Sequence, residues 1–218
     1  MAPYRTLAEL PQLIPVFPLD GALLLPGGEL PLQIFEPRYL NMVDDAMAGD
    51  RVIGMVQTRG GSRKRPILAD VGCLGRITSY AETSDGRYLI TLTGLCRFRT
   101  GEELDLRLPY RQVRATYDPF ADDLGREEDA EAGEAERARF ATALKRYLNR
   151  RELDIDWDTA HEAPLEALVN SLCMGLPFEP AEKQAFLEAE DLTRRFEVLT
   201  TLLEIDASDP DDEPHSLQ

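Results

Sequence analysis

The side chains that could do chemistry are few, and their spacing matches no common enzyme motif. Ser62 follows two glycines, but a nucleophile elbow also needs a glycine two residues after the serine, where Lys64 stands. His161 and Glu162 begin like a zinc-protease motif, yet Leu165 occupies the position of the second histidine. No lysine follows a glycine, so the sequence lacks a phosphate-binding P-loop. These patterns argue against serine-, zinc- and P-loop-dependent hydrolysis.

Forty acidic residues supply carboxylates, but none stands out as a catalytic pair. The adjacent pairs at 102–103 and 122–123 lie in polar surroundings, which is typical of solvated surface charge. A hydrolase that uses such carboxylates or Ser62 is an alternative with no side-chain constellation behind it. The cysteines and histidines are Cys73, Cys96, Cys173, His161 and His215. They are too few and too widely spaced for a disulfide framework or a zinc site. We expect no metal and no cofactor.

The formal charge of −16 is concentrated in the second half of the chain. Residues 1–117 carry 14 basic and 13 acidic side chains, whereas residues 118–218 carry 10 basic and 27 acidic ones. Such acidity repels nucleic-acid phosphates and anionic lipids, so we expect no DNA and no membrane as partners. The apolar stretch at 10–26 is broken by prolines and predicts neither a secretion signal nor a spanning helix. We expect a cytoplasmic protein.

The first half of the sequence is mostly of β type. Ile14–Leu19 and Leu30–Phe35 are apolar runs interrupted by prolines, which favours edge strands or bulges over central strands. Arg51–Gln57 is typical of a buried strand, and Leu104–Tyr117 continues the β character. Residues 88–93 alternate between the two faces of a strand, directly after the turn-forming pair Asp85-Gly86.

Two further patterns complete this half. Cys96 and Phe98 alternate with Arg97 and Arg99, which predicts one apolar and one cationic face on a strand. A single helix is expected over 37–49, with a proline in its first position and a glycine in left-handed conformation at its end; its apolar residues are Leu40, Val43 and Met47.

The second half is helical. Apolar residues recur at helical spacing in four segments, two of which open with a proline; these residues are Phe140, Leu144, Tyr147 and Leu148; Leu165, Leu168, Val169, Leu172 and Leu176; Phe186 and Leu187; and Leu192, Phe196, Leu199 and Leu203. Trp157 is expected to anchor packing between helices. The predicted organisation is a β-rich domain at 1–117, an acidic linker at 118–136, a helical subdomain at 137–206 and a disordered tail at 207–218, which is an α+β arrangement.

The segment from Ile14 to Tyr39 is the best candidate for binding. Its prolines remove backbone donors, so part of its apolar surface can remain open in a groove that suits extended, unfolded polypeptide. The competing interpretation is that its large apolar residues are core. For Glu36 and Arg38, which flank Pro37, a local charge pair at the helix start is favoured over ligand contact.

The order of several motifs resembles one family. Residues 15–19 (PVFPL), 26–28 (PGG), 30–39 (LPLQIFEPRY), 72–77 (GCLGRI), 94–99 (GLCRFR), 176–178 (LPF) and 182–188 (EKQAFLE) are similar to the N-terminal substrate-binding domain of bacterial Lon proteases, in a stand-alone form. The resemblance runs from about residue 12 to 206. It implies a PUA-like, partly open β-barrel with one helix, followed by a bundle of about four helices. It also implies a non-catalytic module, since the ATPase and Ser-Lys protease motifs of the family have no matching positions here.

From this resemblance and from the proline-broken segment, substrate binding is expected at Phe17, Phe35, Glu36, Arg38 and Tyr39. The expected ligands are unfolded or tagged polypeptide segments, bound by an adaptor or holder that works with a protease or a chaperone. We expect a monomer or a weak homodimer. The alternative is an RNA-binding PUA-like protein, which would use the basic loop at 63–65 and the predicted cationic face of Arg97 and Arg99.

Overall fold

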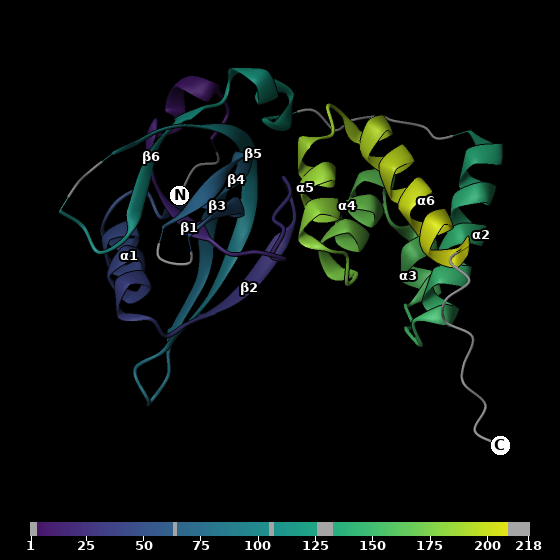
Figure 1. Ribbon diagram of the computed structural model, residues 1–218, viewed down its shortest axis with the longest axis horizontal. Helices are drawn as coiled ribbons and strands as arrows, with labels where there is room; N and C mark the ends of the chain where they lie inside the picture. The colour runs from purple at the N-terminus through teal and green to yellow at the C-terminus, as the bar shows by residue number, and fades with distance from the viewer. Residues whose placement is uncertain (1–3, 63–64, 105–106, 126–132, 209–218) are drawn as a thin grey trace. The chain divides into compact units, whose positions relative to one another are not determined.

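The computed structural model describes residues 4–62, 65–104, 107–125 and 133–208. The first part of the chain forms a six-stranded sheet with one α-helix and two short 3-10 helices (Figure 1). Its elements are η1 (Leu7–Glu9), β1 (Leu13–Pro18), β2 (Glu29–Ile34), α1 (Pro37–Ala48), β3 (Val52–Ser62), β4 (Arg65–Glu82), β5 (Tyr88–Leu104), β6 (Arg111–Thr116) and η2 (Asp118–Asp123).

The sheet curls back on itself. Its strand order is β2-β5-β4-β3-β1-β6, and β6 also pairs with β5. All neighbouring strands are antiparallel except β1 and β3, which are parallel. The long strand β5 makes this possible, because its first half pairs with β2 and its second half with β6. The five strands β5, β4, β3, β1 and β6 thus form a ring, and β2 extends the sheet beyond it as an edge strand.

The edge-strand prediction is confirmed for β2 and wrong for β1. Strand β1 lies between β3 and β6. Its prolines fit because each side of the strand is paired over only part of its length. Pro15 lies opposite Gln112 of β6, before the pairing with β3 begins at Val16, and Pro18 lies opposite Val56 of β3, beyond the pairing with β6. Each missing N–H therefore falls where one neighbour is absent.

The predicted hairpin and helix are present, with one difference at the helix end. Gly86 adopts φ +78 in the turn that joins β4 to β5, a conformation that favours glycine. Helix α1 starts with Pro37 and stops before Gly49. Gly49, however, has φ −114, and Arg51 takes the left-handed conformation with φ +60. The chain reverses two residues later than predicted, with the Arg51 N–H donating to the Ala46 carbonyl over 2.9 Å.

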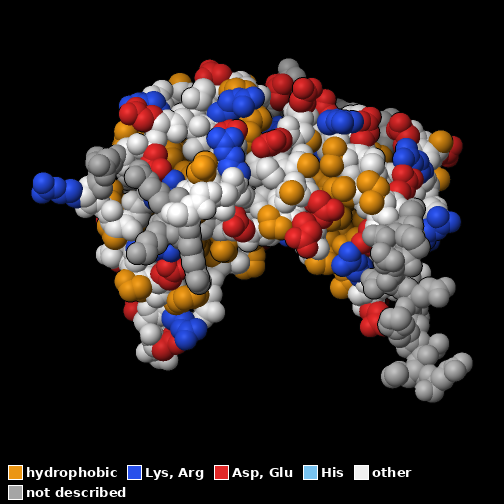
Figure 2. Space-filling view, viewed as in Figure 1, with side chains coloured by type: hydrophobic (Ala, Val, Ile, Leu, Met, Phe, Trp, Pro, Cys, Tyr) orange, Lys and Arg blue, Asp and Glu red, His pale blue; other side chains and the backbone are white. Residues whose placement is uncertain are grey.

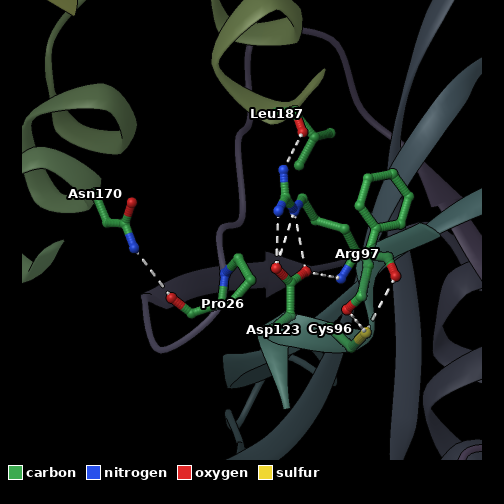
Figure 3. A network of polar contacts seen from close by, with 7 residues as sticks. Pro26, Cys96, Arg97, Asp123, Asn170 and Leu187 are labelled. Carbon is green, nitrogen blue, oxygen red and sulfur yellow. Dashed lines mark hydrogen bonds and ion pairs between the residues drawn. The ribbon is translucent and has the colours of Figure 1, made fainter. Parts of the chain in front are cut away.

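The predicted cationic face on β5 is wrong at Arg97. Cys96 and Phe98 are fully buried as expected, but the Arg97 side chain is buried too. Its guanidinium pairs with the Asp123 carboxylate at 2.8 Å and donates to the Leu187 carbonyl at 3.3 Å (Figure 3). Period-two alternation assigned this side of β5 to solvent, whereas η2 and a later helix cover it. Asp123, expected to be solvated surface charge, is the buried counter-ion.

Five helices follow, one more than predicted. They are α2 (Glu134–Arg150), α3 (Trp157–Glu162), α4 (Leu165–Gly175), α5 (Pro180–Glu188) and α6 (Leu192–Ser208). The unpredicted α3 has only six residues, too few for an apolar stripe, and is started by Asp156, whose carboxylate accepts the N–H groups of Asp158 and Thr159 at 3.1 Å. Helix α6 includes residues 207 and 208, and the rest of the predicted disordered tail lies outside the described residues.

Contacts group the described chain into two compact units. The sheet unit contains residues up to 125 together with Asn170–Glu188, and the helical unit contains 133–169 together with residues 189–208. Within the sheet unit, α5 is bound to the strands through Gln57 of β3, which donates to the Pro180 carbonyl at 3.0 Å, and through the buried Lys183, which donates to the Gly21 carbonyl at 2.9 Å. Asn170 of α4 donates to the Pro26 carbonyl at 3.2 Å (Figure 3).

The core of the helical unit forms between α2 and α6. Phe140 and Phe196 are buried with their ring centroids 5.0 Å apart. The predicted stripes of both helices are buried throughout. At the surface Arg139 pairs with Glu204, and Arg151 with Asp206. These exposed pairs add little stability compared with the apolar contacts beneath them.

Candidate functional site

The residues predicted to bind substrate come together where β2 leads into α1. Phe35 follows the last residue of β2 and is 62% exposed, the largest exposed fraction among the large apolar side chains of the described chain. Glu36 is extended, as expected for a residue before proline, and it places Pro37 in the first turn of α1. We name Phe17, Phe35, Glu36, Arg38 and Tyr39 the α1 corner.

Four of these side chains form a stacked series. The Glu36 carboxylate accepts from Nε of Arg38 at 2.9 Å and from its terminal nitrogen at 2.8 Å. The Arg38 guanidinium lies 4.4 Å from the centroid of the Tyr39 ring. That ring in turn lies 4.2 Å from the Phe17 ring, tilted by 45°. The local charge pair favoured for Glu36 and Arg38 is therefore present.

Exposure separates the five residues into two groups. Phe17 and Tyr39 are buried, at 8% and 6% exposed, whereas Phe35, Glu36 and Arg38 face solvent or reach it in part. Burial raises the pKa of the Tyr39 hydroxyl, and the positive charge of Arg38 offsets part of that rise. Tyr39 is thus a neutral platform under Arg38. The surface available to a ligand is Phe35 with the Glu36–Arg38 pair.

A strip of uncharged side chains leads from this corner across the outer face of the sheet. Gln33 of β2 is the partner of Leu89 in β5, which is the partner of Ala81 in β4. Two residues further along each strand, Pro31, Thr91 and Ser79 are partnered in the same way. Side chains two residues apart in a strand share a face, so these six lie together. Phe35 stands two residues after Gln33, just beyond the end of β2. We name the six residues the β2–β5 strip.

The strip is open to solvent and carries no charge. Leu89 is 44% exposed, and Pro31, Gln33, Ser79 and Ala81 are exposed as well. Charge begins at the end of the strip, where the exposed Glu29 shares the face of Pro31 and is the partner of Thr93 in β5. Within the described sheet β2 has one neighbour only, so its other edge is unpaired. An open edge beside apolar side chains is a surface suited to an extended peptide.

Sequence reasoning missed Leu89. The alternation at 88–93 predicts a strand and places Leu89 on the same face as Thr91 and Thr93. A large apolar residue on an otherwise polar face was the available indication. The register that puts Leu89 beside Gln33 could not be predicted, because pairing between strands distant in sequence leaves no local pattern.

One carboxylate of each adjacent acidic pair has a structural partner. Asp123 neutralises Arg97 inside the sheet unit, and Glu103 holds Arg111 at 2.7 Å. Ser62 lies exposed at the end of β3. Among the described residues no three His, Cys, Asp or Glu side chains are placed to hold a metal ion. The arrangement offers binding surfaces and no recognisable catalytic constellation in the described chain.

The RNA-binding alternative loses Arg97 from its predicted cationic face. Arg97 is committed to Asp123 in the interior, and residues 63 and 64 of the basic loop lie outside the described residues. On the face shown in Figure 2, basic side chains of the described residues are separated by acidic ones and form no continuous stripe. A stripe of that kind is what phosphate-backbone binding requires. No helix in the described part of the chain is long and apolar enough to cross a membrane.

Two solved structures share this fold. The crystal structure of a Lon N-terminal domain protein from Xanthomonas campestris superimposes with a TM-score of 0.62 at 22% identity, covering 87% of this chain and 97% of that one. The N-terminal domain of the Mycobacterium avium complex Lon protease gives 0.60 at 20% identity, covering 88% and 98%. The predicted fold, a partly ringed sheet with one helix followed by C-terminal helices, is confirmed.

Sequence comparison agrees. Lon protease 2 of Myxococcus xanthus is 30% identical over 200 residues, and Lon protease of Anaeromyxobacter dehalogenans is 28% identical over 200. Each match covers 89% of this chain, which spans 24% and 23% of the length of these relatives. The profile of the "ATP-dependent protease La (LON) substrate-binding domain" matches residues 13–204. The chain therefore belongs to the Lon substrate-binding domain family, as its motifs predicted.

Proposed function

We propose that this chain is a non-catalytic module that binds unfolded or tagged polypeptide segments in extended form. The observation that carries the proposal is the β2–β5 strip with Phe35 at its end, an exposed and uncharged surface beside an open strand edge. Main-chain groups of β2 would pair with the peptide, and the apolar side chains of the strip would take up its alternate side chains.

The position of Pro31 in β2 supports binding of a ligand over pairing of this edge with a second copy of the chain. Pro31 lies within β2 and has no N–H to donate to a pairing strand. Such a proline hinders continuous edge-to-edge pairing of two identical sheets. It still leaves room for a short segment held by a few hydrogen bonds and by Phe35 and Leu89. This supports transient capture of polypeptide by a monomer.

The charged pair at the corner supports broad specificity. Glu36 and Arg38 are both about half exposed and satisfy each other, so neither demands a particular ligand charge. An exposed pair of this kind contributes at most about 1 kcal/mol and rearranges easily. The apolar contacts with Phe35 and Leu89 would then dominate affinity, as expected for a module that accepts many unfolded sequences.

The test is fluorescence anisotropy of a labelled, permanently unfolded polypeptide titrated with the full chain. We expect selective binding compared with the same polypeptide in its folded form. The double substitution Phe35→Ser with Leu89→Ser should weaken binding by about tenfold or more, since it removes both apolar anchors. Ile205→Ser is the matched control, because Ile205 is 60% exposed but lies on α6. Equal affinity of all three proteins would refute the proposed surface.

Whether the module acts as a holder or as an adaptor is a separate question. A holder slows aggregation of a denatured client without any protease present. An adaptor accelerates degradation of that client by a Lon protease, and a competitor slows it. We propose the holder activity, because the exposed strip needs no second protein. Aggregation followed by light scattering, with the Phe35→Ser and Leu89→Ser double variant as control, decides it: no delay of aggregation contradicts the proposal.

A further inference from the structure

The open edge of β2 has a carboxylate at one end and an aromatic ring at the other. Glu29 is the first residue of β2 and is exposed, and its carboxylate has no hydrogen bond or ion pair within the described chain. Phe35 stands six residues later and is 62% exposed. Six residues of extended chain span about 20 Å. Because the two ends of this edge differ in chemistry, a bound segment can be recognised in one direction.

A β-bulge defines where the regular edge begins. The Gly27 N–H donates to the Gly94 carbonyl at 3.0 Å, and the Gly94 N–H donates to the Gly28 carbonyl at 2.9 Å. Gly27 has φ +74, which is the conformation of a glycine in the first position of such a bulge. From Glu29 onward β2 pairs with β5 residue by residue, without a shift in register. The edge with which a ligand can pair therefore starts at Glu29.

The hydrogen bonds of this bulge also determine which main-chain groups of β2 point away from β5. Gly28 bonds to β5, and hydrogen-bonded pairs alternate along antiparallel strands. Glu29, Pro31 and Gln33 therefore direct their main-chain groups to the open edge. Pro31 fits this position, because a proline bonded toward β5 would leave a gap in the ladder. An incoming segment can exchange hydrogen bonds in both directions with Glu29 and Gln33, and it can donate to the Pro31 carbonyl.

The side chains of a bound segment would lie opposite those of β2. Antiparallel pairing is favoured, because it is the more stable arrangement per residue and is the one that β2 makes with β5. In such a pair, residues directly opposite each other share a face and their Cβ atoms lie about 5 Å apart. A residue opposite Glu29 would thus project beside its carboxylate. The residue six positions earlier in the segment would lie beside Phe35.

The neighbours of Glu29 across the sheet leave its carboxylate available to a ligand. The residue beside it is Thr93, whose hydroxyl lies 3.0 Å from that of Thr78. The next residue in this row is Arg76, two strand spacings or about 10 Å away. The Arg76 guanidinium lies 5.3 Å from the centroid of the Tyr4 ring. A cationic side chain of the ligand can therefore approach Glu29 from the open edge.

We propose that the β2 edge binds extended segments antiparallel to β2 in which an apolar residue is followed, six residues later, by Lys or Arg. The apolar side chain lies beside Phe35, and the ammonium or guanidinium pairs with Glu29. The inference rests on the proposed function, which supplies the extended segment as ligand. It adds a direction and a charge preference, which the uncharged strip does not provide. Arg38 creates no opposite preference, because Glu36 neutralises it at 2.8 Å.

The test is fluorescence anisotropy of labelled ten-residue peptides titrated with the full chain. The parent peptide has Phe as its second residue, Val as its fourth and sixth, Lys as its eighth, and Thr or Ser elsewhere. We expect it to bind roughly fivefold more tightly than the same peptide with Gln in the eighth position, as for one exposed ion pair. Moving Lys to the seventh position should abolish this gain, because its side chain then projects from the other face of the strand.

Substitutions in the protein assign the charge preference to one residue. Glu29→Gln should remove the preference for Lys over Gln, and Glu29→Lys should reverse it in favour of a peptide with Glu in the eighth position. Glu102→Gln is the matched control, because Glu102 is an exposed glutamate of β5 outside the part that pairs with β2. It changes the net charge equally and should keep the fivefold preference. Circular dichroism verifies that each variant is folded.

The outcomes distinguish this inference from the proposed function. If all peptides bind equally and the Phe35→Ser and Leu89→Ser double variant weakens them all, polypeptide binding stands and the inference fails. It also fails if the Lys preference survives Glu29→Gln, or if the long unfolded polypeptide binds and no peptide does. A preference for the reversed peptide, with Lys third and Phe ninth, would show that the segment runs parallel to β2 and overturn the proposed direction. If nothing binds, both proposals fail.

Discussion

Arg97 and Asp123 show how one buried ion pair holds several elements of the sheet unit together. The guanidinium faces the carboxylate through two of its nitrogens, and the Asp123 carboxylate also accepts the Arg97 backbone N–H at 2.8 Å. A third nitrogen reaches the carbonyl of Leu187 on α5 (Figure 3). The Arg97 side chain is 4% exposed and that of Asp123 8%, so water compensates for neither charge if its partner is lost.

We therefore expect Asp123→Asn to destabilise the protein by about 3–5 kcal/mol, because it leaves the Arg97 charge buried without a counter-ion. The measurement is the free energy of unfolding in urea, followed by circular dichroism. The double substitution Arg97→Met with Asp123→Leu removes both charges and should lose less stability than the single one. A single variant as stable as the wild type, or a double variant worse than the single, would contradict this account.

The three cysteines should be inert in the folded protein. All are buried. Burial raises the pKa of the Cys96 thiol to about 12 and that of Cys73 well above its usual range. The thiolate is the reactive form, so at about pH 8 almost none is present at Cys73 and Cys96, and burial keeps reagent away from all three sulfur atoms. We expect iodoacetamide to label none of them in buffer and all three in strong denaturant, as read by mass spectrometry. Rapid labelling of the native protein would contradict the packing around β4 and β5.

At the scale of elements, Gly94 determines how closely the segment between β1 and β2 approaches β5. A Cβ added at Gly94 would lie 2.0 Å from the Leu25 carbonyl oxygen, which is backbone and cannot rotate away. Gly94 also exchanges hydrogen bonds with this segment, from Gly27 at 3.0 Å and to Gly28 at 2.9 Å. The glycine thus permits a backbone contact that positions β2, and with it Phe35.

Gly94→Ala should therefore destabilise the protein by roughly 1–3 kcal/mol, since the segment must move and its two hydrogen bonds must lengthen. Thermal unfolding followed by circular dichroism measures the change. Gly175→Ala is the control, because a Cβ there has no atom within 4 Å and lies at the end of α4. We expect that control to keep or slightly raise the melting temperature. Identical melting temperatures for the two variants would show that the close approach at Gly94 carries no energy.

Elements with a local pattern could be predicted from the sequence, and elements defined by distant neighbours could not. The stripes of α2 and α6 and the alternation at 88–93 are local, and the structure confirms them. The interior position of β1 depends on two partners that each cover only part of it. Arg97 was assigned to solvent because nothing near it in sequence indicates that η2 and α5 cover that face. Helix α3 was missed because six residues are too few for periodicity.

The same limit applies to the candidate site. The motif around Phe35 predicts a binding site at the α1 corner, and four of its five side chains contact one another in series. Its division into buried Phe17 and Tyr39 and exposed Phe35 needed the packing of α1. Leu89 belongs to the site through strand register. Register is a property of tertiary structure, which a pattern along one segment does not contain.

At the scale of the whole molecule, each of the two units contains its own natural reporter of unfolding. Trp157 lies in the helical unit, and all three cysteines lie in the sheet unit. The helical unit is the smaller, and small cores bury a smaller fraction of their apolar surface. We expect its unfolding to begin at lower urea concentration. Trp157 emission should therefore change before the cysteines become reactive.

Two core truncations make this prediction specific. Leu144→Ala should shift the Trp157 transition to lower urea, by an amount that corresponds to about 2–5 kcal/mol, and leave the thiol transition in place. Leu74→Ala, in the core of the sheet unit, should shift the thiol transition by a similar amount. If each substitution moves both transitions together, the units unfold as one cooperative body. A ligand of the strip would then stabilise the whole chain, whereas under independent unfolding it protects only the cysteines of the sheet unit.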